Sequence, residues 1–249
     1  MKKGTSFRNC VICGATSGIG STIFTELAHL NYNILATFRS EQQMKSLLNQ
    51  LSHPSNVSAV RLDVEDENSV RNFASTCKNQ MATIDLFVNA IGIVAYRPFL
   101  KLSPKDISKV LSINLYSTIN LLQIAIPLMM KSKAQNKTIV QLGSLAGMAY
   151  GHKYFSIYSA AKEGIAGLFR SLAPEFESCG IRFILVRPSG VDTRIADQAI
   201  GRTGLIRKFR ESKLHNPADV AHQMLEHIEF PYQDQYIELI LDNIAEDNL

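Results

Sequence analysis

The sequence predicts an α/β fold in which about seven parallel strands form one doubly wound, Rossmann-like sheet with helices on both faces. Short runs of β-branched and apolar residues alternate with longer amphipathic stretches along nearly the whole chain. The short runs are almost continuously apolar, which is typical of strands that are buried on both faces of a parallel sheet. Right-handed crossovers between such strands favour the doubly wound arrangement.

The predicted elements alternate from one end of the chain almost to the other. Runs such as NCVIC and NILATF are short and apolar, and they predict strands at residues 9–13, 33–38, 57–62, 84–89, 138–142, 181–186 and 236–241. The amphipathic stretches between them predict helices at residues 18–30, 41–51, 65–79, 104–130, 156–178 and 217–229. No linker, repeat or change in composition divides the chain, which predicts one domain over residues 1–249. The irregular stretch 189–216 is too long for an ordinary turn and is expected to be a substrate loop, with a surface insertion as the alternative.

The composition is that of an ordinary globular protein. The chain has 249 residues and a mass of 27.7 kDa, and its 46% hydrophobic and 19% charged residues exclude collagen-like, coiled-coil and largely disordered classes. No apolar run approaches the ~18 residues of a membrane span and the first residues lack an export-signal core, so we expect a cytoplasmic protein without membrane contact. Because side chains alternate along a strand, Cys10 and Cys13 should point to opposite faces of the sheet, and no metal site is expected.

The excess of positive charge lies in one segment. Six basic and two acidic residues stand between Arg194 and Lys213, so this segment accounts for the whole net charge of +4. A nucleic-acid-binding protein would carry a broader basic face or a recognisable reading motif, and we expect no nucleic-acid partner. The segment is compatible with an anionic substrate or an acidic carrier.

A glycine-rich turn follows the first predicted strand. Gly14, Ser17, Gly18, Ile19 and Gly20 belong to the sequence GATSGIG, which opens the first predicted helix. Glycines allow a sharp turn, and the N-H groups and dipole of a helix N-terminus favour a pyrophosphate. The G-x-x-x-G-x-G spacing is neither the G-x-G-x-x-G fingerprint nor a P-loop. Its place in a β-α-β unit favours dinucleotide binding over a merely tight turn.

The end of the second predicted strand indicates which dinucleotide is bound. It reads Ala36-Thr37-Phe38-Arg39-Ser40 and lacks the carboxylate that would bind an NAD ribose. A guanidinium pairs well with phosphate, so Arg39 favours the 2′-phosphate of NADP(H). The alternative is an exposed loop arginine.

A tyrosine and a lysine form the candidate reacting pair. Only Tyr158, of the eight tyrosines, has a lysine four residues later, at Lys162, and residues i and i+4 share one face of a helix. A neighbouring ammonium favours a phenolate and lowers the pKa of the phenol, so Tyr158 is able to exchange a proton with a carbonyl or alcohol. Upstream, Ser144 follows a strand end and is placed to hydrogen-bond a substrate oxygen. An exposed Tyr/Lys pair and a turn serine are the structural alternatives.

These motifs together resemble the short-chain dehydrogenase/reductase superfamily, in its single-domain Tyr-x-x-x-Lys form. The resemblance covers about residues 8–241, with the glycine turn, Asn114, Ser144 and the Tyr158/Lys162 pair in the family's order. It implies that Tyr158 is the acid/base and that Ser144 polarises the substrate oxygen. Lys162 would lower the pKa of Tyr158 and hold the nicotinamide ribose. Asn114 would hold a water against Lys162.

Other positions match cofactor contacts of the same family, and the resemblance implies this role for Asp63, Val64, Asn89, Tyr158, Lys162, Pro188 and Thr193. Asp63 would contact the adenine edge, or it would cap the following helix. Ala90 and Ile91 depart from the family's Asn-Asn-Ala-Gly motif, and Ser189 replaces a glycine. A homodimer or homotetramer is also implied, formed by helices 104–130 and 156–178.

The predicted function is therefore that of an NADP(H)-dependent oxidoreductase that moves a hydride between nicotinamide and a carbonyl or alcohol carbon of a small molecule. Of the two directions, we favour reduction. We expect the substrate pocket to be lined by residues 94–99, 148–155 and 195–209. One alternative is a non-catalytic NADP(H) sensor, which needs no proton donor. Another is a reductase of carrier-bound 3-oxoacyl groups, whose acidic carrier would dock on Arg202, Arg207, Lys208 and Arg210.

Overall fold

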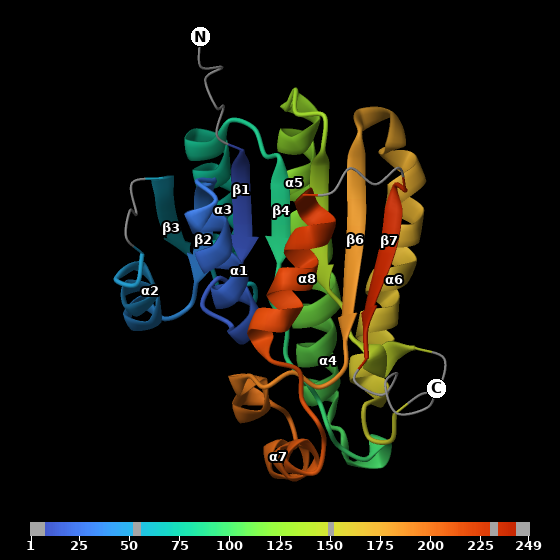
Figure 1. Ribbon diagram of the computed structural model, residues 1–249. Helices are drawn as coiled ribbons and strands as arrows, with labels where there is room; N and C mark the ends of the chain where they lie inside the picture. Colours follow the sequence, from blue (N-terminus) through green and yellow to red (C-terminus); the bar gives the residue numbers. More distant parts are fainter. Residues whose placement is uncertain (1–7, 52–55, 149–151, 230–233, 243–249) are drawn as a thin grey trace.

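Seven parallel strands form one sheet in the order β3-β2-β1-β4-β5-β6-β7 (Figure 1). The computed structural model describes residues 8–51, 56–148, 152–229 and 234–242. The strands are β1 (Asn9–Cys13), β2 (Asn33–Phe38), β3 (Val57–Arg61), β4 (Leu86–Asn89), β5 (Lys137–Leu142), β6 (Ile181–Pro188) and β7 (Tyr236–Leu241). The predicted doubly wound α/β fold is confirmed.

The helices lie between these strands, as the alternating pattern predicts. They are α1 (Gly18–His29), α2 (Glu41–Leu48), α3 (Glu67–Met81), α4 (Pro104–Leu111), α5 (Ser117–Lys131), α6 (Ser156–Glu175), α7 (Arg202–Arg210) and α8 (Pro217–Glu229). Short helical segments join them at η2 (Phe99–Lys101), η3 (Ser112–Tyr116), η4 (Leu145–Gly147), η5 (Glu177–Cys179) and η6 (Arg194–Gln198).

The order of the strands reverses beside β1. The chain runs outward from β1 through β2 to β3, then returns to place β4 on the other side of β1. Ile12 is consequently paired with Ala36 of β2 and with Val88 of β4. In a parallel sheet the crossovers leave the carboxyl ends of β1 and β4 in opposite directions, which opens a crevice at that edge.

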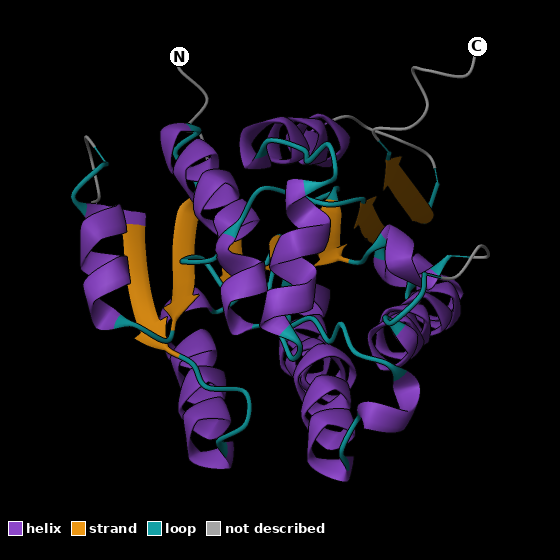
Figure 2. Cartoon of the chain, turned by 90° about the horizontal axis from the view of Figure 1, so that it is seen from below, coloured by secondary structure: helices purple, strands orange, loops and turns teal. Residues whose placement is uncertain are grey.

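Two apolar cores cover the two faces of the sheet. One packs α1, α2 and α8 against the strands, and the other packs α3, α5 and α6 against the opposite face. Seen from the side of the strand ends, helices stand on both sides of the sheet (Figure 2). Cys10 belongs to the first core and Cys13 to the second, which confirms that their side chains point to opposite faces.

The predicted long helix 104–130 is interrupted. It divides into α4 and α5, and the five-residue π-helical turn η3 lies between them. The buried side chain of Asn114 hydrogen-bonds both backbone groups of Ile93 and the carbonyl of Val110. The spacing of apolar residues does not reveal such a π-helical turn. Turns of this kind often occur at functional sites.

The stretch 189–216 is not irregular throughout, contrary to the prediction. It contains η6 and α7, which lie beyond the carboxyl ends of the strands (Figure 1). Gly201 directly precedes α7 and adopts φ +81°, and an added Cβ there would meet the carbonyl oxygen of Tyr96 at 2.0 Å. Leu205 is fully buried, while Arg202, Arg207 and Arg210 of α7 are exposed. The helix therefore depends on packing against the 94–97 segment, which the local sequence does not reveal.

Residues 104–131 are long and apolar enough to cross a membrane by length and composition alone. Just over half of their most apolar window is buried, at 56%, and α5 packs in the second core. The core helix of a globular domain passes the same test, so this finding is weak evidence for a membrane span. The C-terminal residues 243–249 and residues 149–151 of the expected pocket lie outside the described part of the chain.

Candidate active site

Two cavities meet at the edge of the sheet where β1 and β4 end. The first has a volume of about 330 Å³ and extends from the glycine turn to Arg39. The second, of about 510 Å³, extends from Tyr158 to α7. Both are lined by Ile19, Ala90, Ile91, Gly92, Leu142, Thr193 and Ile195. The cavities are therefore two halves of one groove at the position where this class of fold binds ligands.

The glycine turn forms the floor of the first cavity. Gly14 adopts φ +82°, and an added Cβ on Gly20 would lie 2.2 Å from the Gly14 carbonyl oxygen. Ser17 caps α1 by accepting a hydrogen bond from the Gly20 N-H at 3.1 Å. The first N-H groups of α1, at Gly18 and Ile19, have no partner within the helix. This geometry fits an anionic group at the N-terminus of α1.

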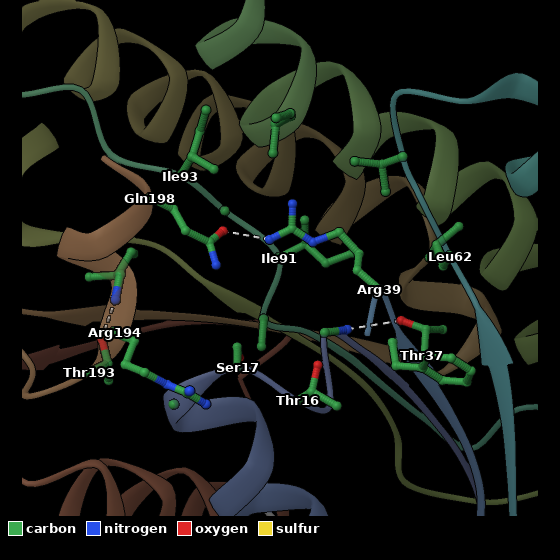
Figure 3. Close-up of a pocket in the computed structure, with 18 of the residues that line it drawn as sticks. Thr16, Ser17, Thr37, Arg39, Leu62, Ile91, Ile93, Thr193, Arg194 and Gln198 are labelled. Carbon is green, nitrogen blue, oxygen red and sulfur yellow. Dashed lines mark hydrogen bonds between the residues drawn. The ribbon is translucent and has the colours of Figure 1, made fainter. Parts of the chain in front are cut away.

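Seven more of the expected cofactor residues line one or both cavities, Tyr158 among them in the second. Arg39, Asp63, Val64 and Thr193 line the first, and Pro188, Thr193 and Lys162 line the second. Arg39 is exposed, and its Nη2 donates to Gln198 Oε1 at 2.6 Å across the cavity (Figure 3). Asp63 does not cap α3, because the capping side chain is that of Asp66.

Gly20 and Asn89 line neither cavity. Asn89 is 1% exposed, and its Nδ2 donates to Gln141 Oε1 at 2.9 Å and to Thr118 Oγ1 at 3.2 Å. Its Oδ1 accepts from the Ile91 N-H at 3.1 Å. Asn89 therefore ties β4 to β5 and α5 and shapes the turn below the groove, although Ala90 and Ile91 depart from the family motif.

Ser144, Tyr158 and Lys162 meet at the second cavity. Tyr158 and Lys162 lie on α6 and are 6% and 3% exposed. Ser144 follows β5, where its Oγ caps η4 by accepting from the Ala146 N-H at 3.1 Å, and its side chain is hydrogen-bonded to Tyr158. All three side chains line the same cavity.

Burial dominates the acidity of this pair. It raises the pKa of the Tyr158 phenol to about 12, against the opposing effect of the hydrogen bond with Ser144, and lowers the pKa of the Lys162 ammonium to about 8. In this structure burial decides the direction of the shift, and the expectation that Lys162 lowers the pKa of Tyr158 stays a prediction. The Lys162 Nζ lies 5.6 Å from the centre of the tyrosine ring and donates instead to the Leu142 carbonyl at 2.8 Å.

Asn114 lies behind the lysine. It is fully buried in η3, and an added Cβ on Gly92 would lie 2.8 Å from Asn114 Oδ1 and 3.4 Å from Lys162 Nζ. The side-chain amide of Asn114 and the ammonium of Lys162 therefore both face the space beside Gly92. The amide is already bonded to the Ile93 backbone, so in this structure Asn114 supports the loop under the groove.

The second cavity is mainly apolar, with cations at its rim. The expected segments contribute Val94, His152, Phe155, Ile195, Lys208 and Phe209, and other segments contribute Leu145, Val191, Ser212, Lys213 and Leu214. Arg194 and Gln198 line the first cavity and were not predicted as cofactor residues. Their position inside a basic stretch was the only available signal, and it did not indicate which side chains face the groove.

Comparison with known proteins agrees with this geometry. Residues 8–202 match the family described as short chain dehydrogenase. The chain belongs to the short-chain dehydrogenase/reductase superfamily. "Carbonyl reductase family member 4" of Xenopus laevis is 29% identical over 233 residues, covering 94% of this chain and 95% of that protein. The Danio rerio protein of the same name is 31% identical over 229 residues, covering 90% and 92%.

One further relative and one solved structure add to this comparison. A "3-oxoacyl-(acyl-carrier-protein) reductase" of Thermotoga maritima is 28% identical over 206 residues, covering 82% of this chain and 80% of that protein. A short-chain dehydrogenase structure from Streptomyces avermitilis superposes with a TM-score of 0.80 at 20% identity, covering 94% of this chain and 89% of the other. The chain is thus an oxidoreductase of a superfamily that acts on alcohol or carbonyl groups with a nicotinamide cofactor.

A buried ion-pair network supports the site from behind. Arg187 of β6 is 1% exposed, and its guanidinium contacts Glu163 Oε1 and Glu238 Oε2, each at 2.5 Å. The same guanidinium donates to the Ser144 carbonyl at 3.4 Å. Because Glu163 directly follows Lys162, this network joins β6, β7, α6 and the serine turn.

Replacing Arg187 should destabilise the fold. Arg187→Met removes the shared cation of two partly exposed carboxylates, and we expect the free energy of unfolding to fall by about 1.5–3 kcal/mol. Arg170→Met is the matched control, because Arg170 binds the same Glu238 at 3.2 Å but is half-exposed, and it should cost at most about 1 kcal/mol. Urea denaturation of both variants measures the difference, and equal losses would contradict the prediction.

Proposed function

We propose that the protein is an NADP(H)-dependent reductase of carbonyl compounds. The observation that carries this proposal is the meeting of Ser144, Tyr158 and Lys162 in the second cavity, where Lys162 contacts Leu142, a residue that lines both cavities. A half-buried hydroxyl, a buried phenol and a buried ammonium lie there, beside the position at which the glycine turn would deliver a nicotinamide. A sensor without catalysis would not need a buried proton donor, which disfavours that alternative.

The proposed roles follow from the atoms available. A bound nicotinamide supplies the hydride. The Ser144 hydroxyl orients the substrate carbonyl oxygen, and the Tyr158 phenol donates its proton to that oxygen. The Lys162 ammonium stabilises the resulting phenolate and holds the nicotinamide ribose, and Asn114 supports the proton supply to Lys162. In the opposite direction the phenolate accepts the proton of an alcohol.

The proposed preference for NADP(H) rests on Arg39. Its guanidinium lines the cavity at the end of β2, where a carboxylate would favour NAD. Asp63 and Val64 form the adjacent wall and are proposed to contact the adenine. Asn89, Pro188 and Thr193 complete the proposed cofactor surroundings, Asn89 through the turn that it supports.

The substrate is proposed to be a small carbonyl compound with an apolar body. The second cavity is largely apolar, and Lys208 at its rim favours a substrate with an anionic group. Relatives named as carbonyl reductases and as a 3-oxoacyl carrier-protein reductase support this chemistry. A carrier-bound substrate is the second candidate, because Lys208 belongs to the basic helix α7, where Arg202, Arg207 and Arg210 are available to an acidic carrier.

We also propose a homodimer or homotetramer in the cytoplasm. Tyr116 and Met130, on the helical segment 104–131, are 62% and 51% exposed, which supports an interface through that segment. Four irregularly spaced cysteines, three of them buried, support a reducing compartment.

Removing the phenol hydroxyl should abolish turnover without loss of cofactor. Tyr158→Phe is expected to lower kcat for carbonyl reduction by about 10²–10⁴-fold, because the proton donor is lost. The Kd for NADPH, followed by nucleotide fluorescence, should stay within about twofold of that of the parent protein. Tyr116→Phe, at an exposed tyrosine, is the control and should retain full turnover. Substantial turnover in Tyr158→Phe would exclude the assigned acid.

Reduction should slow above about pH 8. The lowered pKa of Lys162 means that its ammonium is lost as the pH rises through about 8, and the phenolate then loses its counter-charge. We expect kcat/KM for reduction to be level below that pH and to fall up to tenfold per pH unit above it. Lys162→Arg should move the fall to higher pH. A level profile through pH 10 would show that the ammonium does not take part.

The guanidinium of Arg39 should discriminate between the two nicotinamide cofactors. Arg39→Ala is expected to raise the Kd for NADPH by about 10- to 100-fold and to leave that for NADH unchanged, because only NADPH carries the 2′-phosphate. Arg71→Ala, at an exposed arginine outside the groove, is the control. Equal affinities of Arg39→Ala and the parent for NADPH would refute the assignment.

A further inference from the structure

Arg194 is a cation of the first cavity to which none of the motifs assigns a role. It is the first residue of η6, is exposed, and lines the cavity together with Ser17, Gly18 and Ile19. Its side chain reaches from η6 toward the beginning of α1 (Figure 3). Within the described ranges of the chain, its guanidinium has no hydrogen bond or ion pair.

Packing between η6 and the glycine turn holds Arg194 in this place. An added Cβ on Gly18 would lie 2.3 Å from Thr193 Cγ2 and 2.6 Å from Thr193 Cβ, so the Thr193 side chain packs directly on the backbone of Gly18. The Thr193 hydroxyl caps η6 by accepting from the Ile195 N-H at 3.4 Å. Since Arg194 directly follows Thr193, its Cα is fixed next to the N-terminus of α1.

The other charges along the cavity are engaged or lie farther toward the adenosine end. Asp197 faces Arg202 at 3.4 Å, and Arg39 is bonded to Gln198. Gln198 is four residues after Arg194, which at the ~2 Å rise of a 3₁₀ helix separates the two positions by about 8 Å. The two guanidinium groups therefore serve different parts of the groove, one near the helix N-terminus and one near the end of β2.

We propose that Arg194 binds the pyrophosphate of the dinucleotide from the side opposite α1. The proposal rests on the proposed function only in requiring that a dinucleotide occupies the groove. Helix α1 offers N-H groups and a positive dipole end, and Arg194 adds a full charge that is able to make two parallel hydrogen bonds with phosphate oxygens. Because Arg194 belongs to the substrate loop, cofactor binding then ties η6 to the phosphate loop at the boundary of the substrate cavity.

Three nucleotides separate this role from that of Arg39. ADP carries the pyrophosphate alone, adenosine 2′-monophosphate carries only the 2′-phosphate, and NADPH carries both. Binding of each to the full chain is measured by isothermal titration or by displacement of fluorescent NADPH. Arg194→Ala should raise the Kd for ADP and NADPH by about 10-fold or more and leave that for adenosine 2′-monophosphate unchanged. Arg39→Ala should show the opposite selectivity between the two fragments.

The controls make the outcome decisive. Arg194→Lys retains the charge and should recover part of the affinity for ADP, and Arg207→Ala, elsewhere in the basic segment, should change none of the three. Unchanged ADP affinity in Arg194→Ala, or an equal loss for all three nucleotides, would overturn the proposal. Should the parent protein bind ADP and NADH but show no preference for NADPH, the NADP(H) assignment would fail while the ADP measurement would still decide the role of Arg194.

Discussion

The parallel pairing of all seven strands is the constraint on which the rest of this structure depends. Parallel strands require a crossover after each strand, and the crossovers place every carboxyl end at one edge of the sheet. Reversal of the strand order beside β1 then opens a crevice between Gly14, after β1, and Ala90, after β4. The glycine turn after β1, the turn at Ser144 after β5 and the 189–216 segment after β6 meet there, because each follows the carboxyl end of a strand.

The second determinant of the site is the cost of burying an ammonium. Lys162 is almost fully enclosed between α6 and the end of β5, and its charge is partly compensated by the Leu142 carbonyl. The same enclosure makes the phenol of Tyr158 a weaker acid. In the proposed mechanism the nicotinamide ribose and the substrate would change these surroundings, so that the proton affinity of the pair would depend on what occupies the groove. The ion-pair network of Arg187 connects the turn at Ser144 to α6, the helix that carries this pair.

Much of the fold was predictable because periodicity and composition are local properties. Apolar runs such as 9–13 and 33–38 became neighbouring strands with the expected bounds, and the alternation with amphipathic helices indicated the parallel sheet. The interruption at η3 was not predictable, because it depends on hydrogen bonds between Asn114 and Ile93, 21 residues away. Helix α7 was missed for a related reason, since its highly charged sequence forms a helix by burying Leu205 against distant residues.

The sequence alone determined the order of the elements, the glycine turn after β1, and the candidate set Ser144, Tyr158 and Lys162. Each of these is defined by residue types and by their spacing along the chain. Tertiary structure alone decided which side chains face the groove. Asn89 bonds within the sheet and does not line the cavity, while Arg194 and Gln198 line the same cavity as the glycine turn. It also decided that Tyr158 is a weaker acid than a free phenol, since burial is a property of the packed protein and not of the i, i+4 spacing.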